Sequence, residues 1–167
     1  MTDDERASFE RTFRLHYAEL CDFAAFYVGS ADEAEEVVQD VFFAIWLRRE
    51  DMETRVSMRS YLFGAVRNHA LHNSRHASVV RRHVEESTAA PQPTAAGLDE
   101  IFEGDEAALE LHRAIAALPP RTRLAMELRW LRQMSYAEVA EVMRISVKGV
   151  EKLITEGMAK LRTLLLP

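Results

Sequence analysis

The sequence predicts an all-α fold made of two small helical domains joined by a flexible linker. Three observations support this prediction. Apolar residues recur at three- and four-residue steps in both halves of the chain, as they do in amphipathic helices. Ser-x-x-Glu pairs, which form the capping boxes that start helices, occur at Ser30 and at Ser135. Residues 87–97 lie between them and consist mainly of small residues and prolines, which contribute little to a core.

The first domain is expected to span residues 1–76. Its first helix, over residues 4–27, should end at Gly29, and its buried stripe should comprise Phe9, Phe13, Tyr17, Leu20, Ala24 and Tyr27. The second helix should open at the capping box of Ser30 and Glu33. Its expected apolar face comprises Ala34, Val37, Val38, Val41, Phe42, Ile45 and Trp46.

The opposite face of this second helix combines acidic residues with one large aromatic side chain. Its members are Asp32, Glu35, Glu36, Gln39, Asp40 and Phe43. Contact with solvent is enough to explain the acids. An exposed Phe43 beside acids is instead typical of an interface with another molecule.

The third helix, over residues 58–76, lies in a strip without acidic residues. From residue 54 to residue 84 there is no Asp or Glu, yet there are six arginines and four of the six histidines. The expected core residues are Tyr61, Leu62, Ala65, Val66, Ala70 and Leu71, and the more exposed ones are Arg59, Arg67, Asn68 and Arg75. His69, His72 and His76 have helical spacing, but no carboxylate or cysteine accompanies them, so we expect no metal site and no cofactor.

Residues 77–105 are predicted to be a flexible acidic linker, and residues 106–167 a second helical domain. Leu111, Ile115 and Leu118 mark its first helix, which Pro119 and Pro120 end. A second helix over residues 121–131 should bury Leu124, Leu128 and Leu131. Residues 135–162 then read as a short helix, a turn at residues 144–146 and a longer helix.

This last segment follows the helix-turn-helix plan, whose second helix can enter a DNA major groove. The inner face should comprise Val147, Val150, Ile154, Gly157, Met158 and Leu161, and the outer face Lys148, Glu151, Lys152, Thr155 and Glu156. A helical hairpin used only for packing would look similar. Gly149 costs roughly 1 kcal/mol relative to Ala inside a helix, which suggests that something approaches it closely.

The distribution of charge agrees with DNA contact by the second domain. The net charge of the whole chain is −6. However, residues 107–167 carry ten Lys and Arg against six Asp and Glu.

The sequence also excludes several classes of protein. No apolar run is long enough for a membrane span, and because the start is acidic we expect no signal peptide. The single cysteine, Cys21, is expected to be a small core residue, and the protein is expected to be cytoplasmic. No phosphate loop, nucleophile triad or catalytic carboxylate pair is present, so we expect no enzyme.

Three segments, in order, resemble the extracytoplasmic-function (ECF) sigma factors of the sigma-70 family. AEEVVQDVFFAIW, residues 34–46, is similar to the polymerase-binding segment of region 2. SYLFGAVRNHAL, residues 60–71, is similar to its promoter-melting and minus-ten segment. LPPRTRLAMELRWLRQMSYAEVAEVMRISVKGVEKL, residues 118–153, resembles region 4. The expected domains are therefore region 2 at 1–76 and region 4 at 106–167.

The resemblance implies a function and a set of site residues. Such a factor binds core RNA polymerase, directs it to particular promoters and helps to open the DNA; an anti-sigma factor commonly inhibits it, and it does not insert into membranes. The implied polymerase contacts are Glu36, Gln39, Asp40 and Phe43. The implied minus-ten contacts are Arg59, Arg67, Asn68 and Arg75, and the minus-thirty-five contacts are Lys148, Glu151, Lys152 and Thr155. Many members carry basic residues where Glu151, Leu153 and Glu156 stand here.

Two other functions stay open at this point. A stand-alone helix-turn-helix transcriptional regulator should carry an upstream phosphoacceptor or ligand domain, and residues 1–76 do not resemble one. A helical adaptor that does not contact DNA would leave the acid-free strip unexplained.

Overall fold

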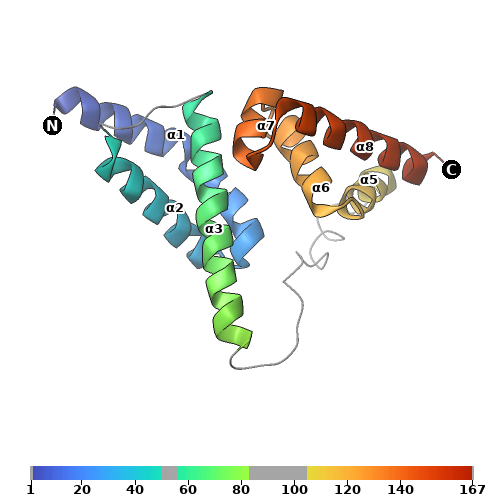
Figure 1. Cartoon of the computed structure of the whole chain (residues 1–167), viewed down its shortest axis with the longest axis horizontal. Coiled ribbons are helices and arrows are strands. Elements are labelled where there is room, and N and C mark those ends of the chain that lie inside the picture. Colours follow the sequence, from blue (N-terminus) through green and yellow to red (C-terminus); the bar gives the residue numbers. More distant parts are fainter. Residues whose placement is uncertain (1, 50–55, 83–104, 167) are drawn as a thin grey trace. The chain divides into compact units, whose positions relative to one another are not determined.

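The computed structural model describes residues 2–49, 56–82 and 105–166, without the side chains of residues 74–82. These residues form helices, caps and turns, without a strand, so the all-α prediction is confirmed. The chain divides into two compact units, Met1–Pro93 and Thr94–Pro167, each of which contains helices (Figure 1). The predicted linker lies mostly in residues 83–104, outside the described residues.

The first unit consists of α1 (Asp3–Val28), α2 (Ala31–Leu47) and α3 (Met58–Arg82). Gly29 ends α1 with a φ of 82°, a backbone conformation that glycine adopts without strain. The Ser30 hydroxyl accepts a hydrogen bond from the Glu33 N–H at 3.2 Å, which is one half of the predicted capping box. A complete box, which the sequence analysis missed, starts α1 at Thr2 and Glu5. Helix α3 runs six residues further than predicted.

The core of the first unit lies where α1 packs against both α2 and α3. The expected face of α2 is buried except for Trp46, which is half-buried. In α1, Leu20 and Ala24 are buried as predicted, but Phe9, Phe13, Tyr17 and Tyr27 are only half-buried. The largest core side chains are instead Phe23 and Phe63, whose rings lie 4.8 Å apart. Cys21 is half-buried, so its prediction as a core residue was wrong.

The second unit contains α5 (Glu106–Ala116), α6 (Pro120–Met126), the π-helix η2 (Glu127–Leu131), α7 (Tyr136–Met143) and α8 (Val147–Leu165). Helix α8 packs against α5, α6 and α7. Among the described helices, none combines the length and the apolar character that a membrane span requires.

The π-helix explains why one predicted core position is wrong. The sequence predicts one regular helix over residues 121–131 with Leu131 inside, but Leu131 is 78% exposed. A π-turn holds one more residue than an α-turn, and the Arg132 N–H accordingly reaches the Glu127 carbonyl, five residues back. The following side chains are therefore rotated around the axis. Leu111 of α5 is also exposed, and the small Ala114 is buried in its helix.

The π-helix begins with a carboxyl group that is mostly shielded from water. The side chain of Glu127 is 14% exposed, and its Oε1 lies 4.0 Å from the Nη2 of Arg132. Burial raises the pKa of this carboxyl above its usual range, and the attraction of Arg132 and Arg123 offsets only part of that effect. The charged form of Glu127 is therefore less favourable in the folded state than that of a glutamate in water.

Gly157 provides the close helix approach that the sequence analysis had looked for at Gly149. A Cβ atom at Gly157 would collide with the sulfur of Met126 and lie 2.9 Å from Cγ2 of Thr122, both on α6. At Gly149 the nearest atom to a new Cβ would be the Ser146 Oγ, at 3.3 Å. Glycine is therefore required where α8 crosses α6.

We expect Gly157→Ala to destabilise the protein by about 1–3 kcal/mol, the usual cost of overpacking a core. Gly149→Ala is the matched control and should change the free energy of unfolding by less than about 1 kcal/mol, because the new methyl meets the Ser146 hydroxyl and, at ordinary contact distance, Ile145, and the residue gains helix propensity. Urea unfolding of both variants measures the difference. Equal effects would mean that the α6–α8 contact tolerates a side chain.

We expect the stability of the Glu127→Gln variant relative to the wild type to increase as the pH rises from about 4, near the ordinary glutamate pKa, to 7. Between that value and the raised pKa, the folded wild type keeps a proton that the unfolded chain has lost. Its free energy of unfolding therefore falls with rising pH in this window. The amide does not titrate. Urea unfolding across the pH range tests this, and a difference that stays flat or shrinks would contradict it.

Candidate nucleic-acid and partner interfaces

The helix-turn-helix forms as predicted, because both of its helices have defined starts. The Ser135 Oγ accepts from the Glu138 N–H at 3.1 Å, and the Ser135 N–H donates to the Glu138 carboxylate at 3.2 Å. Arg144 ends α7 with a φ of 55°, and the Ile145 N–H bonds to the Ala140 carbonyl. Ser146 then caps α8 by accepting from the Gly149 N–H at 3.0 Å. These bonds fix the turn that aims α8.

The outer face of α8 is exposed along its first three turns. Lys148, Glu151, Lys152 and Thr155 are all exposed, while Val150, Ile154, Gly157 and Leu161 are buried on the opposite side. The Lys152 Nζ lies 3.9 Å from the Glu156 Oε1 in an i,i+4 pair with both side chains largely in solvent. Such a pair is weak and breaks easily, so Lys152 can turn toward an anionic partner. Val147 and Met158, predicted to be inside, are exposed.

The outer face of α2 is exposed as predicted, and two of its residues reach other helices. Phe43 is 64% exposed and Glu36 is exposed. The Asp40 Oδ2 lies 3.2 Å from the Nε2 of His69 on α3, and the Gln39 amide donates to the Tyr17 hydroxyl of α1 at 3.4 Å. This face is therefore a helical surface with acids and an apolar residue, tied at two points to its neighbours.

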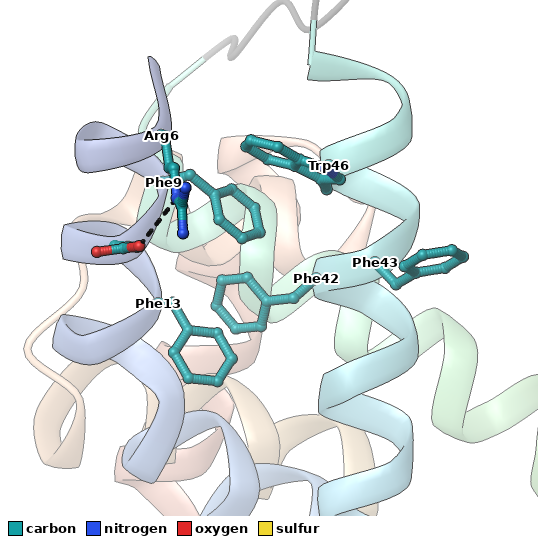
Figure 2. A pocket seen from close by; sticks show the side chains of 7 residues that line it. Arg6, Phe9, Phe13, Phe42, Phe43 and Trp46 are labelled. Carbon is teal, nitrogen blue, oxygen red and sulfur yellow. Dashed lines mark ion pairs between the residues drawn. The ribbon is translucent and has the colours of Figure 1, made fainter. Parts of the chain in front are cut away.

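An aromatic groove of about 380 Å³ lies beside this face, between α1 and α2. Figure 2 shows Phe9, Phe13, Phe42 and Trp46 turned toward one another, while Phe43 projects outward from α2. The Phe9 ring lies 4.7 Å from that of Trp46, and the guanidinium of Arg49 lies 4.5 Å from the same Trp46 ring. The sequence predicts all four rings in the core, but only Phe42 is buried, whereas Phe9, Phe13 and Trp46 are half-buried.

The acid-free strip on α3 is not as free as its sequence suggests. The Arg59 Nε and Nη2 each donate to one carboxylate oxygen of Glu19 on α1, both at 3.0 Å. Glu19 also pairs with the Nδ1 of His16 at 3.1 Å. Burial acts to raise the pKa of the Glu19 carboxyl, but the hydrogen bonds from Arg59 and His16 outweigh it and hold the pKa below its usual range. Nothing in the local sequence indicates the contact of Glu19 with Arg59, because the two residues are forty positions apart.

The other predicted minus-ten residues lie further along α3. Arg67 and Asn68 are half-buried, and within the described part of the chain the buried Arg67 Nε has no hydrogen-bond partner. The side chain of Arg75 lies outside the described residues. So do residues 50–55 of the stretch 48–57, which the resemblance to sigma factors predicts to be a loop that receives an unstacked base. Arg67 and Asn68 are therefore neighbours on α3, whereas Arg59, at the start of the same helix, is bound to Glu19.

Both units match family models. Residues 12–79 match sigma-70 region 2, and residues 108–161 match sigma-70 region 4. Among curated proteins no match was found.

Solved structures with a similar fold include complexes of regulatory proteins. The sigma factor RpoE, bound to the anti-sigma factor NepR, from Bartonella quintana, has a TM-score of 0.62 at 21% identity, over 95% of this chain and 96% of that one. CnrH, bound to the cytosolic domain of CnrY, has a TM-score of 0.64 at 24% identity, over 96% and 88%. The PhyRSL–NepR complex from Sphingomonas sp. Fr1 has a TM-score of 0.57 at 18% identity, over 92% and 86%.

Proposed function

The chain belongs to the sigma-70 family, as an ECF-type member built from regions 2 and 4, and on this premise we propose which of its surfaces meet polymerase and promoter DNA. It is an RNA polymerase sigma factor, which binds the core enzyme and directs it to promoters. The match of residues 12–79 to region 2 carries this conclusion, because a stand-alone helix-turn-helix regulator does not need that domain. We propose that it works in the cytoplasm and catalyses no reaction of its own.

The outer face of α2 is proposed to bind core polymerase. Glu36, Gln39 and Asp40 would meet basic residues of the polymerase, and Phe43 would bury its exposed ring in the contact. The support is the combination of acids with a 64% exposed Phe43, because a large ring kept in water is typical of a surface that becomes covered. On binding, Asp40 would exchange His69 for a polymerase cation.

Helix α3 and α8 are proposed to contact the two promoter elements. Arg67 and Asn68 would meet minus-ten DNA, and the same role stays a prediction for Arg59 and Arg75. On α8, Lys148 and Lys152 would contact phosphates or guanine. Glu151 would accept from a cytosine amino group, and Thr155 would contact a phosphate or a thymine methyl. The support for α8 is that all four side chains are exposed on one face of a capped helix.

An inhibitory protein partner is also proposed. RpoE was solved with the anti-sigma factor NepR, and its fold resembles this chain over 95% of the length. Such a partner would bind the exposed faces that polymerase and DNA also need, so its binding and that of core polymerase should exclude each other.

Reversing the charge of Asp40 tests the polymerase face. We expect Asp40→Lys to weaken core binding by about 2–5 kcal/mol, because a like charge replaces a partner that is desolvated in the complex. Titration of labelled protein with purified core polymerase gives the affinity. His69→Ala removes the intramolecular partner of Asp40 and should leave core affinity intact, and Asp22→Lys repeats the charge change at an exposed site on α1. If Asp40→Lys binds as well as Asp22→Lys does, the assignment is wrong.

Selection from a promoter library by run-off transcription tests both the function and the reading helix. Wild type with core polymerase should enrich two elements that core polymerase alone does not enrich. We expect Glu151→Ala to lose about 1–3 kcal/mol of discrimination at one upstream position, and Lys152→Ala, as a phosphate contact, to weaken all sequences alike. Lys160→Ala on the same helix is the control, since it is exposed beyond the proposed reading residues. Unchanged preferences in both variants would exclude α8 as the reader.

A further inference from the structure

We infer that Glu19 is a positioning residue for promoter opening, which acts on minus-ten DNA through Arg59 and the start of α3 and does not touch the DNA itself. This inference rests on the proposed role of α3 at the minus-ten element. It replaces the predicted DNA contact of Arg59 by a structural role within the first unit, in which Arg59 binds Glu19 and not a phosphate.

The contact between the two residues has the geometry of a rigid clamp. Two parallel N–H donors of one guanidinium meet the two oxygens of one carboxylate, each at 3.0 Å, and this arrangement fixes orientation as well as distance. The His16 ring nitrogen approaches the Glu19 Oε1 from the same helix at 3.1 Å. The guanidinium of Arg59 also lies 5.5 Å from the centre of the buried Phe63 ring. The plane of Arg59 is thus fixed at its edge by Glu19 and at its face by Phe63.

Partial burial makes this contact stronger than an ordinary surface ion pair. Both side chains are 27% exposed, and that of His16 is 12% exposed. A second ion pair among the described residues of α1, between Arg6 and Glu10, has exposed fractions of 65% and 53% and joins two residues of the same helix. Water screens the Arg6–Glu10 pair far more, so that pair is the weaker one. It also lies within one helix, so of these two contacts the Glu19–Arg59 contact is the one that can hold one helix against another.

The location of the clamp links it to promoter opening. Arg59 is the second residue of α3, and the hydroxyl of Ser57 accepts from the Ser60 N–H at 3.1 Å just before it. The clamp therefore sets where α3 begins relative to α1. Arg67 and Asn68, two turns further on, are carried by the same helix and inherit its placement.

The electrostatics of the clamp distinguish positioning from phosphate contact. A cation that binds a phosphate releases counterions and steepens the dependence of binding on salt. The charge of Arg59 is already compensated by a carboxylate in direct contact with it. Loss of Arg59 should therefore slow DNA opening. It should leave the slope of promoter affinity against salt unchanged, because no phosphate contact is lost.

A double-mutant cycle tests the inference, with core polymerase and a promoter recovered by the wild-type selection. Glu19→Gln and Arg59→Met should each slow the appearance of permanganate-reactive thymines by about 10- to 100-fold, the range expected when a positioned group moves by about 1 Å. The double variant should be no slower than either single one. Core affinity and the slope of promoter affinity against salt should match the wild type.

Controls separate this role from general loss of stability. Glu10→Gln removes the carboxylate of the Arg6–Glu10 pair on the same helix and should open DNA at the wild-type rate. Glu19→Asp keeps the charge but retracts it by one methylene, so it should fall between wild type and Glu19→Gln. All variants are compared below their melting temperatures, and Glu19→Asp serves in place of Glu19→Gln if the amide variant does not fold.

Three results would overturn the inference: wild-type opening by both Glu19 variants, additive effects in the double variant, or a salt slope that falls by about one in Arg59→Met, which is the signature of a lost phosphate contact. Failure of the proposed function would look different, because wild-type protein with core polymerase would then open no promoter at all.

Discussion

The structure depends on one constraint: each helix has only a few neighbours, so it can bury one face and must expose the other. In α2 the buried face is almost entirely aliphatic and aromatic, and the exposed face carries the acids and Phe43. In α8 the buried face closes on α6 through Gly157, which leaves Lys148, Glu151, Lys152 and Thr155 in water. A small helical domain thus provides binding surfaces as a direct consequence of how it packs.

The exposed faces are not independent of each other, because polar contacts connect the helices that carry them. Asp40 on the proposed polymerase face pairs with His69 on the proposed DNA helix, and Glu19 on α1 holds Arg59 at the start of that helix. The first contact is largely exposed and is easily exchanged for an external partner, whereas the second is partly buried and persists. The domain can therefore give up one contact to the polymerase and still keep α3 in register.

The sequence predicted what local rules decide and failed where distant residues decide. The caps at Ser30, Ser135 and Ser146, the stop at Gly29 and the two faces of α2 follow from neighbours within four residues. They formed as expected, except that Ser30 makes only half of its capping box and Trp46 is half-buried. Leu131 was misplaced because nothing in the local pattern indicates a π-turn. Arg59 looked free because its partner lies forty residues away. The sequence placed Gly157 on the inner face of α8 but indicated Gly149 as the close approach, and only the position of α6 shows that the approach is at Gly157.

The balance of charges on the second domain bears on how such a chain finds DNA. Its basic residues attract phosphates, yet Glu151 and Glu156 stand among them on the outer face of α8, and the whole chain carries a net charge of −6. Non-specific affinity for DNA comes almost entirely from phosphate neutralisation, so acids on the reading face lower it for every sequence alike. An acid that accepts a hydrogen bond from a base recovers that loss at the matching position only. The acids on α8 and the net charge of −6 therefore oppose the binding of the free protein to DNA of arbitrary sequence.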